Sequence, residues 1–161
     1  MKRKLICLIM IGALCLSFSG CNSENNNDKE KSFSVTENKL TKANVNAKIV
    51  HGYATGWLID ALINDLEVQN ELKGKMVFCN KKGIYTDENG NKLDFDEDLD
   101  KHVDYDFTGC FAFEIDKDGD SITSAYWSED KIIEIAEITD PDEQMQYCKK
   151  NKQIIGIYPF S

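Results

Sequence analysis

Seven acidic residues lie close together between positions 94 and 106, and convergent carboxylates are the ligands that calcium prefers in proteins. They are Asp94, Asp96, Glu97, Asp98, Asp100, Asp104 and Asp106, of which the alternating Asp94, Asp96 and Asp98 are the candidate metal ligands. An EF-hand loop that began at Asp94 would have Leu99 in place of its glycine and Tyr105 in place of its bidentate glutamate. We therefore favour solvated acids in the first turn of a short helix, where the helix dipole stabilises negative charge. A calcium-dependent surface binding module using residues 94–106 is the alternative.

A second acidic stretch, Asp116-Lys117-Asp118-Gly119-Asp120, also resembles a calcium loop, but its glycine comes too early. A tight hairpin turn explains the same residues, because such turns need backbone conformations that glycine and aspartate tolerate. We expect a hairpin turn here.

Catalysis by a cysteine nucleophile requires a histidine within hydrogen-bonding reach and a third group that orients the histidine. The chain has two histidines, His51 and His102, and Cys110 lies eight residues after His102. Nothing in this spacing shows that the side chains meet, so a Cys/His hydrolase is the second alternative. The sequence also contains neither a glycine-rich phosphate loop nor a Gly-x-Ser-x-Gly elbow. We expect a protein that is not an enzyme and holds no cofactor.

The N-terminal residues have the layout of a secretory signal: Lys2, Arg3 and Lys4 precede an apolar run from Leu5 to Phe18. The next residues complete the motif Phe18-Ser19-Gly20-Cys21, which resembles the bacterial lipoprotein box, although Phe18 stands where that family usually has leucine. The resemblance implies that residues 1–20 are a signal peptide and that Cys21 receives a diacylglyceryl group. An ordinary cleaved signal with an incidental cysteine is the alternative.

A lipid on Cys21 would hold the protein on the outer face of the cell membrane, because two acyl chains anchor a protein stably. Residues 21–41 contain almost no apolar side chains and are interpreted as the lipidated cysteine and a flexible tether. Residues 42–161 are then one globular domain. No later stretch is apolar for the roughly 20 residues that a spanning helix needs.

The composition is acidic, with 19 basic and 28 acidic residues and a net charge of −9. Loss of residues 1–20 removes three basic residues and no acidic ones, which leaves 16 against 28 and a net charge of −12. Such a surface repels the phosphate backbone, so a nucleic-acid partner is excluded. An extracellular protein or glycan is the expected class of partner.

Three of the six cysteines, Cys79, Cys110 and Cys148, belong to the expected domain. An odd number allows at most one disulfide among them, and the sequence does not decide which pair forms or whether all three stay reduced. A Cys-x-x-Cys spacing is absent, which disfavours zinc.

Apolar residues at three- and four-residue intervals predict a long amphipathic helix over about 43–72, closed by Gly74. Gly52 and Gly56 lie inside it and indicate close packing in the core. Further patterns predict strands at 76–79, 84–86, 109–115, 122–127 and 153–158, and helices beginning at Asp94 and covering 141–151. Residues 131–138 are ambiguous between helix and strand.

Three segments carry a second resemblance: Ala43-Asn44-Val45-Asn46-Ala47-Lys48, Ser124-Ala125-Tyr126-Trp127-Ser128 and Ile155-Gly156-Ile157-Tyr158-Pro159. Together they resemble the globular domains of type IV pilin-like and pseudopilin-like proteins of Gram-positive gut bacteria. The resemblance implies an α+β domain in which a long N-terminal helix packs on an antiparallel sheet of about four strands, with short additional helices. Pilins keep their apolar N-terminal segment for filament assembly, whereas here that segment precedes Gly20 and is expected to be removed. We therefore expect a lipid-tethered, non-enzymatic binding or scaffolding domain.

Overall fold

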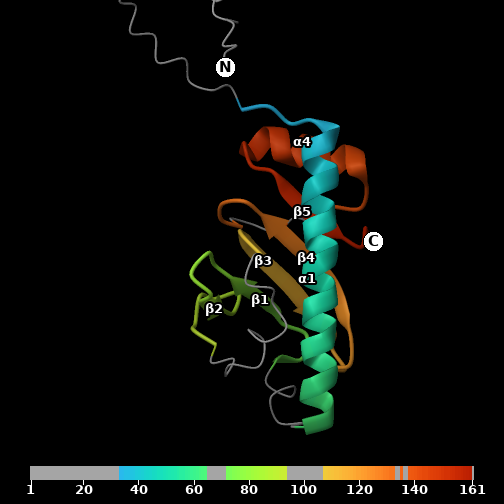
Figure 1. Ribbon diagram of the computed structural model, residues 1–161, viewed down its shortest axis with the longest axis vertical. Coiled ribbons are helices and arrows are strands. Elements are labelled where there is room, and N and C mark those ends of the chain that lie inside the picture. Colours follow the sequence, from blue (N-terminus) through green and yellow to red (C-terminus); the bar gives the residue numbers. More distant parts are fainter. Residues whose placement is uncertain (1–32, 65–71, 94–106, 133–134, 136–137, 161) are drawn as a thin grey trace, which may run out of the picture. The chain divides into compact units, whose positions relative to one another are not determined.

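The computed structural model describes residues 33–64, 72–93, 107–132, 135 and 138–160. The elements are α1 (Glu37–Asn64), β1 (Met76–Cys79), β2 (Tyr85–Thr86), β3 (Cys110–Ile115), β4 (Ile122–Ser128), α4 (Pro141–Asn151) and β5 (Ile155–Tyr158) (Figure 1). Phe33–Ser161 forms one compact unit with its own hydrophobic core. The predicted α+β class is confirmed. Within the described ranges, no helix has the length and apolar character needed to cross a membrane.

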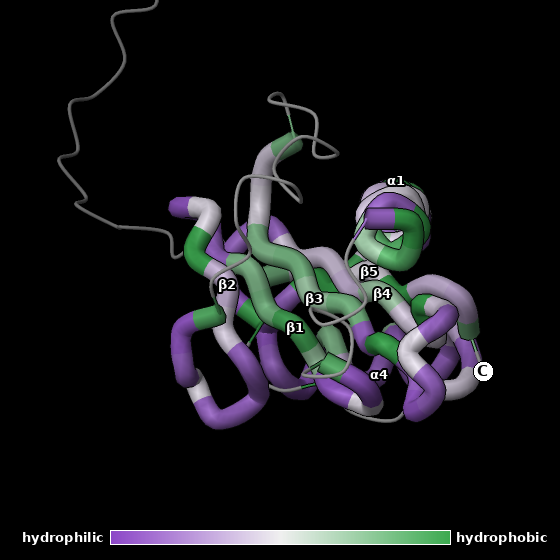
Figure 2. Tube along the Cα trace, turned by 90° about the horizontal axis from the view of Figure 1, so that it is seen from below, coloured by the Kyte–Doolittle hydropathy of each residue, from purple (hydrophilic) through white to green (hydrophobic). Residues whose placement is uncertain are grey.

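All neighbouring strands pair antiparallel, in the order β2-β1-β3-β4-β5, so the sheet has five strands rather than about four. Because side chains alternate between the two faces of a strand, the register decides which residues meet the helix. Val77, Phe113 and Ala125 occupy one row of the face that belongs to the main core. Figure 2 shows the predominantly hydrophobic stretches along β1 and β3 and a hydrophilic loop beside β2.

Helix α1 lies on this face and packs mainly against β4 and β5 (Figure 1). Its buried residues recur at three- and four-residue intervals: Leu40, Ala43, Ala47, Val50, Ala54, Trp57 and Leu58. The helix begins at Glu37, where the backbone N–H of Leu40 donates to the carbonyl of Thr36 at 3.1 Å. Residues 37–41 were expected to belong to the flexible tether, and this part of the prediction is wrong. They are helical because Leu40 packs against Cys148 and Ile155.

Close packing of α1 occurs at a glycine of β5 and not at Gly52. Gly52 lies on the exposed side of α1, and a Cβ added there would meet no heavy atom within 4 Å, so core packing at Gly52 is wrong. The close approach occurs instead at Gly156 of β5, where an added Cβ would collide with the backbone carbonyl of Ala43. Glycine at position 156 is what allows α1 to lie directly on β5.

Helix α4 begins and ends where the sequence predicts. The Asp140 carboxylate caps it by accepting hydrogen bonds from the N–H groups of Asp142 and Glu143, and Pro141 occupies the first turn. Lys152 ends the helix in the left-handed conformation, with φ 50°.

A buried amide pair joins α4 to α1 and β5. Gln144, which is fully buried, donates through Nε2 to Asn44 Oδ1 at 2.6 Å and to the Ile155 carbonyl at 2.7 Å. Asn44 Oδ1 also accepts from the Ile157 N–H at 3.0 Å. Because an unpaired buried polar group is costly, this network determines how the three elements meet.

The expected helix beginning at Asp94 lies outside the described residues. In the segment that was ambiguous between helix and strand, residues 131, 132, 135 and 138 belong to neither.

Candidate functional site

One end of the sheet is the best candidate for a binding site, and we call it the sheet-end site. Because the strands are antiparallel, the end of β1, the start of β3 and the end of β4 meet there. Two half-open pockets of about 530 Å³ and 300 Å³ share Cys79, Asn80 and Phe111 in their walls. Chain segments far apart in the sequence thus form one hollowed region.

The larger pocket has aromatic walls and a charged rim. Its lining includes Tyr85, Phe107 and Phe111, together with Lys81 and Glu129. Phe111 packs edge-to-face against both other rings, with centroids 6.2 Å from Tyr85 and 5.9 Å from Phe107. These mutual contacts hold the rings in place before any ligand arrives. The arrangement is suited to binding an apolar or ring-shaped group beside one cation and one anion.

The loop between β1 and β2 forms part of the rim and is held by Asn80. The Asn80 Oδ1 accepts hydrogen bonds from the N–H of Lys82 at 2.8 Å and from the N–H of Ile84 at 3.2 Å. Gly83 supplies the positive φ, 71°, that the turn requires. These hydrogen bonds of the Asn80 side chain hold the loop in a turn.

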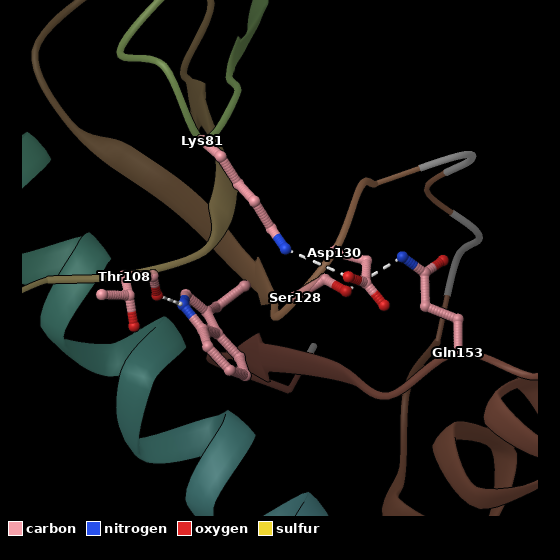
Figure 3. A network of polar contacts seen from close by, with 6 residues as sticks. Lys81, Thr108, Ser128, Asp130 and Gln153 are labelled. Carbon is pink, nitrogen blue, oxygen red and sulfur yellow. Dashed lines mark hydrogen bonds and ion pairs between the residues drawn. The ribbon is translucent and has the colours of Figure 1, made fainter. Parts of the chain in front are cut away.

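Figure 3 shows three polar contacts around the sheet end. Lys81 Nζ lies 3.1 Å from Asp130 Oδ1, and Trp127 Nε1 donates to the Thr108 carbonyl at 2.9 Å. Gln153 Nε2 donates to Ser128 Oγ at 2.9 Å. The ion pair is exposed and therefore weak, whereas the other two contacts join the end of β4 to neighbouring segments.

The three domain cysteines are free and buried. Cys79 pairs with Phe111 in the sheet, so Cys79 and Cys110 point to opposite faces. Cys148 lies on the buried side of α4, where its sulfur accepts a hydrogen bond from the Ile155 N–H at 3.4 Å. Burial raises the pKa of the Cys148 thiol above its usual value of 9.0, although the Ile155 hydrogen bond opposes this effect. Cys148 therefore remains a protonated thiol and is a poor nucleophile.

His51 lies at the opposite end of the sheet from the cysteines. Its Nε2 is 3.0 Å from the Ile122 carbonyl, which can only accept, so Nε2 carries the proton and donates. The ring also packs edge-to-face on Tyr158 at 5.1 Å. Ile122 pairs with Ile115, at the far end of β3 from Cys110 and about 17 Å away along the strand. The contacts of His51 are thus structural.

The remaining predicted site residues separate into two groups. Asp116 Oδ1 accepts hydrogen bonds from the N–H groups of Gly119 and Asp120, at 2.6 Å and 2.9 Å, which confirms the hairpin turn at Gly119. Among the described residues, no group of three or more metal-ligating side chains converges. Cys21, His102 and the candidate ligands Asp94, Asp96 and Asp98 lie outside the described residues.

No protein-family model, curated protein or solved structure matches the chain. The function is therefore inferred from the chain's own residues. Sequence reasoning did not identify Lys81, Phe107 or Glu129, because each looks like an ordinary loop residue until the strand ends are brought together. The turn sequence Asn80-Lys81-Lys82-Gly83 is the local signal nearest to the site.

Proposed function

We propose that the protein is a lipid-anchored, non-enzymatic binding or scaffolding module on the outer face of a Gram-positive-type cell membrane. The motif Phe18-Ser19-Gly20-Cys21, placed directly after a basic and apolar leader, carries this proposal. A diacylglyceryl group on Cys21 would hold the domain at the surface through residues 22–36, which precede α1.

The sheet-end site supports the binding part of the proposal. Its aromatic walls and its charged rim residues, Lys81 and Glu129, suit a sugar ring or a peptide side chain, so the proposed partner is an extracellular glycan or protein. Cys110 lies at one end of β3, whereas His51 of α1 contacts Ile122, which pairs with the other end of β3, so these two groups do not meet. His102, the other histidine of the Cys/His hydrolase alternative, lies outside the described residues.

A pilin-like relationship is the finer part of the proposal. The position of α1 along an antiparallel sheet agrees with the arrangement that the resemblance implies. Loss of residues 1–20 would remove the apolar segment that pilins use to build a filament. The proposed role is therefore that of a tethered domain and not of a filament subunit.

The anchor is tested by Cys21→Ala, with Cys15→Ala in the apolar leader as the matched control. We expect Cys21→Ala protein to appear in the culture medium, while Cys15→Ala protein stays with the membranes. Cell fractionation, with mass spectrometry of the N-terminal peptide, measures both outcomes. Retention of Cys21→Ala protein in the membrane fraction would disprove the anchor.

Ligand binding at the sheet end is tested by the fluorescence of Trp127, whose indole donates to the Thr108 carbonyl beside the larger pocket. Soluble cell-wall glycans are titrated into the protein and into Phe107→Ala, which removes one aromatic wall. We expect a saturable change that weakens at least tenfold in the variant. Equal responses of the two proteins would move the binding site elsewhere.

A further inference from the structure

A stripe of exposed aliphatic side chains follows the outer side of α1. Its members and their exposed fractions are Val45 at 53%, Ile49 at 37%, Ile59 at 50% and Ile63 at 74%. With about 100° of rotation per residue, all four lie within about 40° of one line along the helix. The buried residues of α1 follow the opposite side. Helix α1 therefore has a second apolar face, which does not contribute to the hydrophobic core.

Two glycines lie on the same line at the centre of the stripe. Gly52 is exposed, and a Cβ there would enter open space, so the fold of one copy does not need glycine at this position. Gly56 follows one turn later and is partly exposed. Glycines four residues apart leave a notch in a helix surface that allows the backbone of another helix to approach closely.

We propose that the stripe is the contact surface between two copies of this chain, whose α1 helices cross antiparallel at Gly52 and Gly56. The residues of the stripe are arranged symmetrically about position 54. A two-fold axis there places Val45 opposite Ile63 of the partner subunit and Ile49 opposite the partner's Ile59. It also places Gly52 opposite the partner's Gly56. A surface that matches itself in this way is what a two-fold interface requires.

The distribution of charge favours a second copy on this face. Helix α1 carries three lysines, Lys39, Lys42 and Lys48, against two acids, Glu37 and Asp60, and thus has a net charge of +1. The whole chain has a net charge of −9, so most other faces of two copies repel each other. The four aliphatic residues and two glycines of the stripe are uncharged, and Lys48 and Asp60 lie at its two edges.

The size of the stripe sets the strength of the dimer. Val45 and Ile63 are about 27 Å apart along the helix, and a seam about 10 Å wide covers roughly 300 Å² on each copy. The total of about 600 Å² is below the 1,200–2,000 Å² typical of stable complexes. We therefore expect a reversible dimer with a dissociation constant near 100 μM.

Sedimentation equilibrium of residues 33–161, which form one compact unit with its own core, tests the proposal. For the unsubstituted parent protein, we expect the average molecular mass to rise from that of a monomer toward that of a dimer as the protein concentration increases. Ile59→Glu places a charge in the seam and should raise the dissociation constant at least tenfold. Ile84→Glu is the matched control, because Ile84 is exposed to 40% and lies outside α1.

Gly52→Leu separates an interface from a folding defect. The new side chain enters open space in one copy and improves the helix, so the thermal midpoint should stay equal or rise while the dimer is lost. A parent that stays monomeric up to about 1 mM would overturn the proposal. So would an unchanged dimer in both Ile59→Glu and Gly52→Leu.

Disulfide trapping tests the antiparallel direction. Ile49→Cys and Ile59→Cys are made separately, and we expect a mixture of the two to cross-link more than either alone. A parallel pair would instead cross-link each variant with itself, which would overturn the proposed geometry. The chain's own Cys79, Cys110 and Cys148 are buried. The parent protein, treated in the same way, measures any cross-linking through these three cysteines. If the parent is monomeric but floats with phospholipid vesicles, and Ile59→Glu does not, the stripe contacts lipid and the dimer proposal is wrong.

Discussion

Replacing Gly156 by alanine tests the crossing of α1 over β5. The added methyl group would collide with the backbone carbonyl of Ala43, which cannot rotate away as a side chain can. Overpacking of this kind costs about 1–3 kcal/mol. Lifting α1 from β5 also weakens the hydrogen bond from Ile157 N–H to Asn44 Oδ1, which contributes about 1 kcal/mol. We expect Gly156→Ala to lower the free energy of unfolding by about 2–4 kcal/mol.

Urea unfolding of residues 33–161 measures this loss, because Trp57 and Trp127 are both buried in the core and report on it by fluorescence. With a slope of about 2 kcal/mol/M, the midpoint should fall by about 1–2 M at unchanged slope. Gly52→Ala is the matched control: it fills open space and should stabilise the helix by about 0.5–1 kcal/mol. A Gly156→Ala midpoint within about 0.2 M of the parent would refute the crossing geometry.

Three further predictions concern buried and titrating groups. Gln144→Leu should lower the free energy of unfolding by about 2–4 kcal/mol, since it removes the Gln144 hydrogen bonds to Asn44 and to the Ile155 carbonyl; an unchanged urea midpoint would contradict the buried network. The Asn91 side chain, with the backbone N–H groups of Asn91 and Asn89, holds the pKa of Asp87 below its usual 3.8. This stabilisation is present above pH 3.8 and is lost as the pH falls through the lower folded pKa, so Asp87→Asn should show a smaller loss of urea midpoint between pH 5 and pH 2 than the parent. Iodoacetamide at pH 8 should label Cys148 far more slowly in the folded protein than in urea, because burial raises the thiol pKa; equal rates measured by peptide mass spectrometry would show that Cys148 is accessible.

The candidate site contains one feature that depends on local sequence and one that depends on long-range strand pairing. The turn at Asn80–Gly83 is held by hydrogen bonds between residues only two to four positions apart in the chain. The sheet-end site combines Lys81, Phe107 and Glu129, whose proximity depends on strand pairing. No periodicity or spacing relates these three positions, so the sequence alone could not identify the site.

Local chemistry determined several elements from the sequence by itself. Asp140 and Pro141 start α4, and Gly119 forms the turn between β3 and β4, because capping and turn hydrogen bonds join residues only a few positions apart. Tertiary structure decided which glycine is essential for packing. Gly52 and Gly156 look alike in sequence, yet only Gly156 meets a backbone carbonyl, since that contact requires Ala43 and Gly156 to be brought together from distant parts of the chain. The same long-range packing, of Leu40 against Cys148 and Ile155, extends α1 to Glu37 in a stretch whose polar composition predicts a tether.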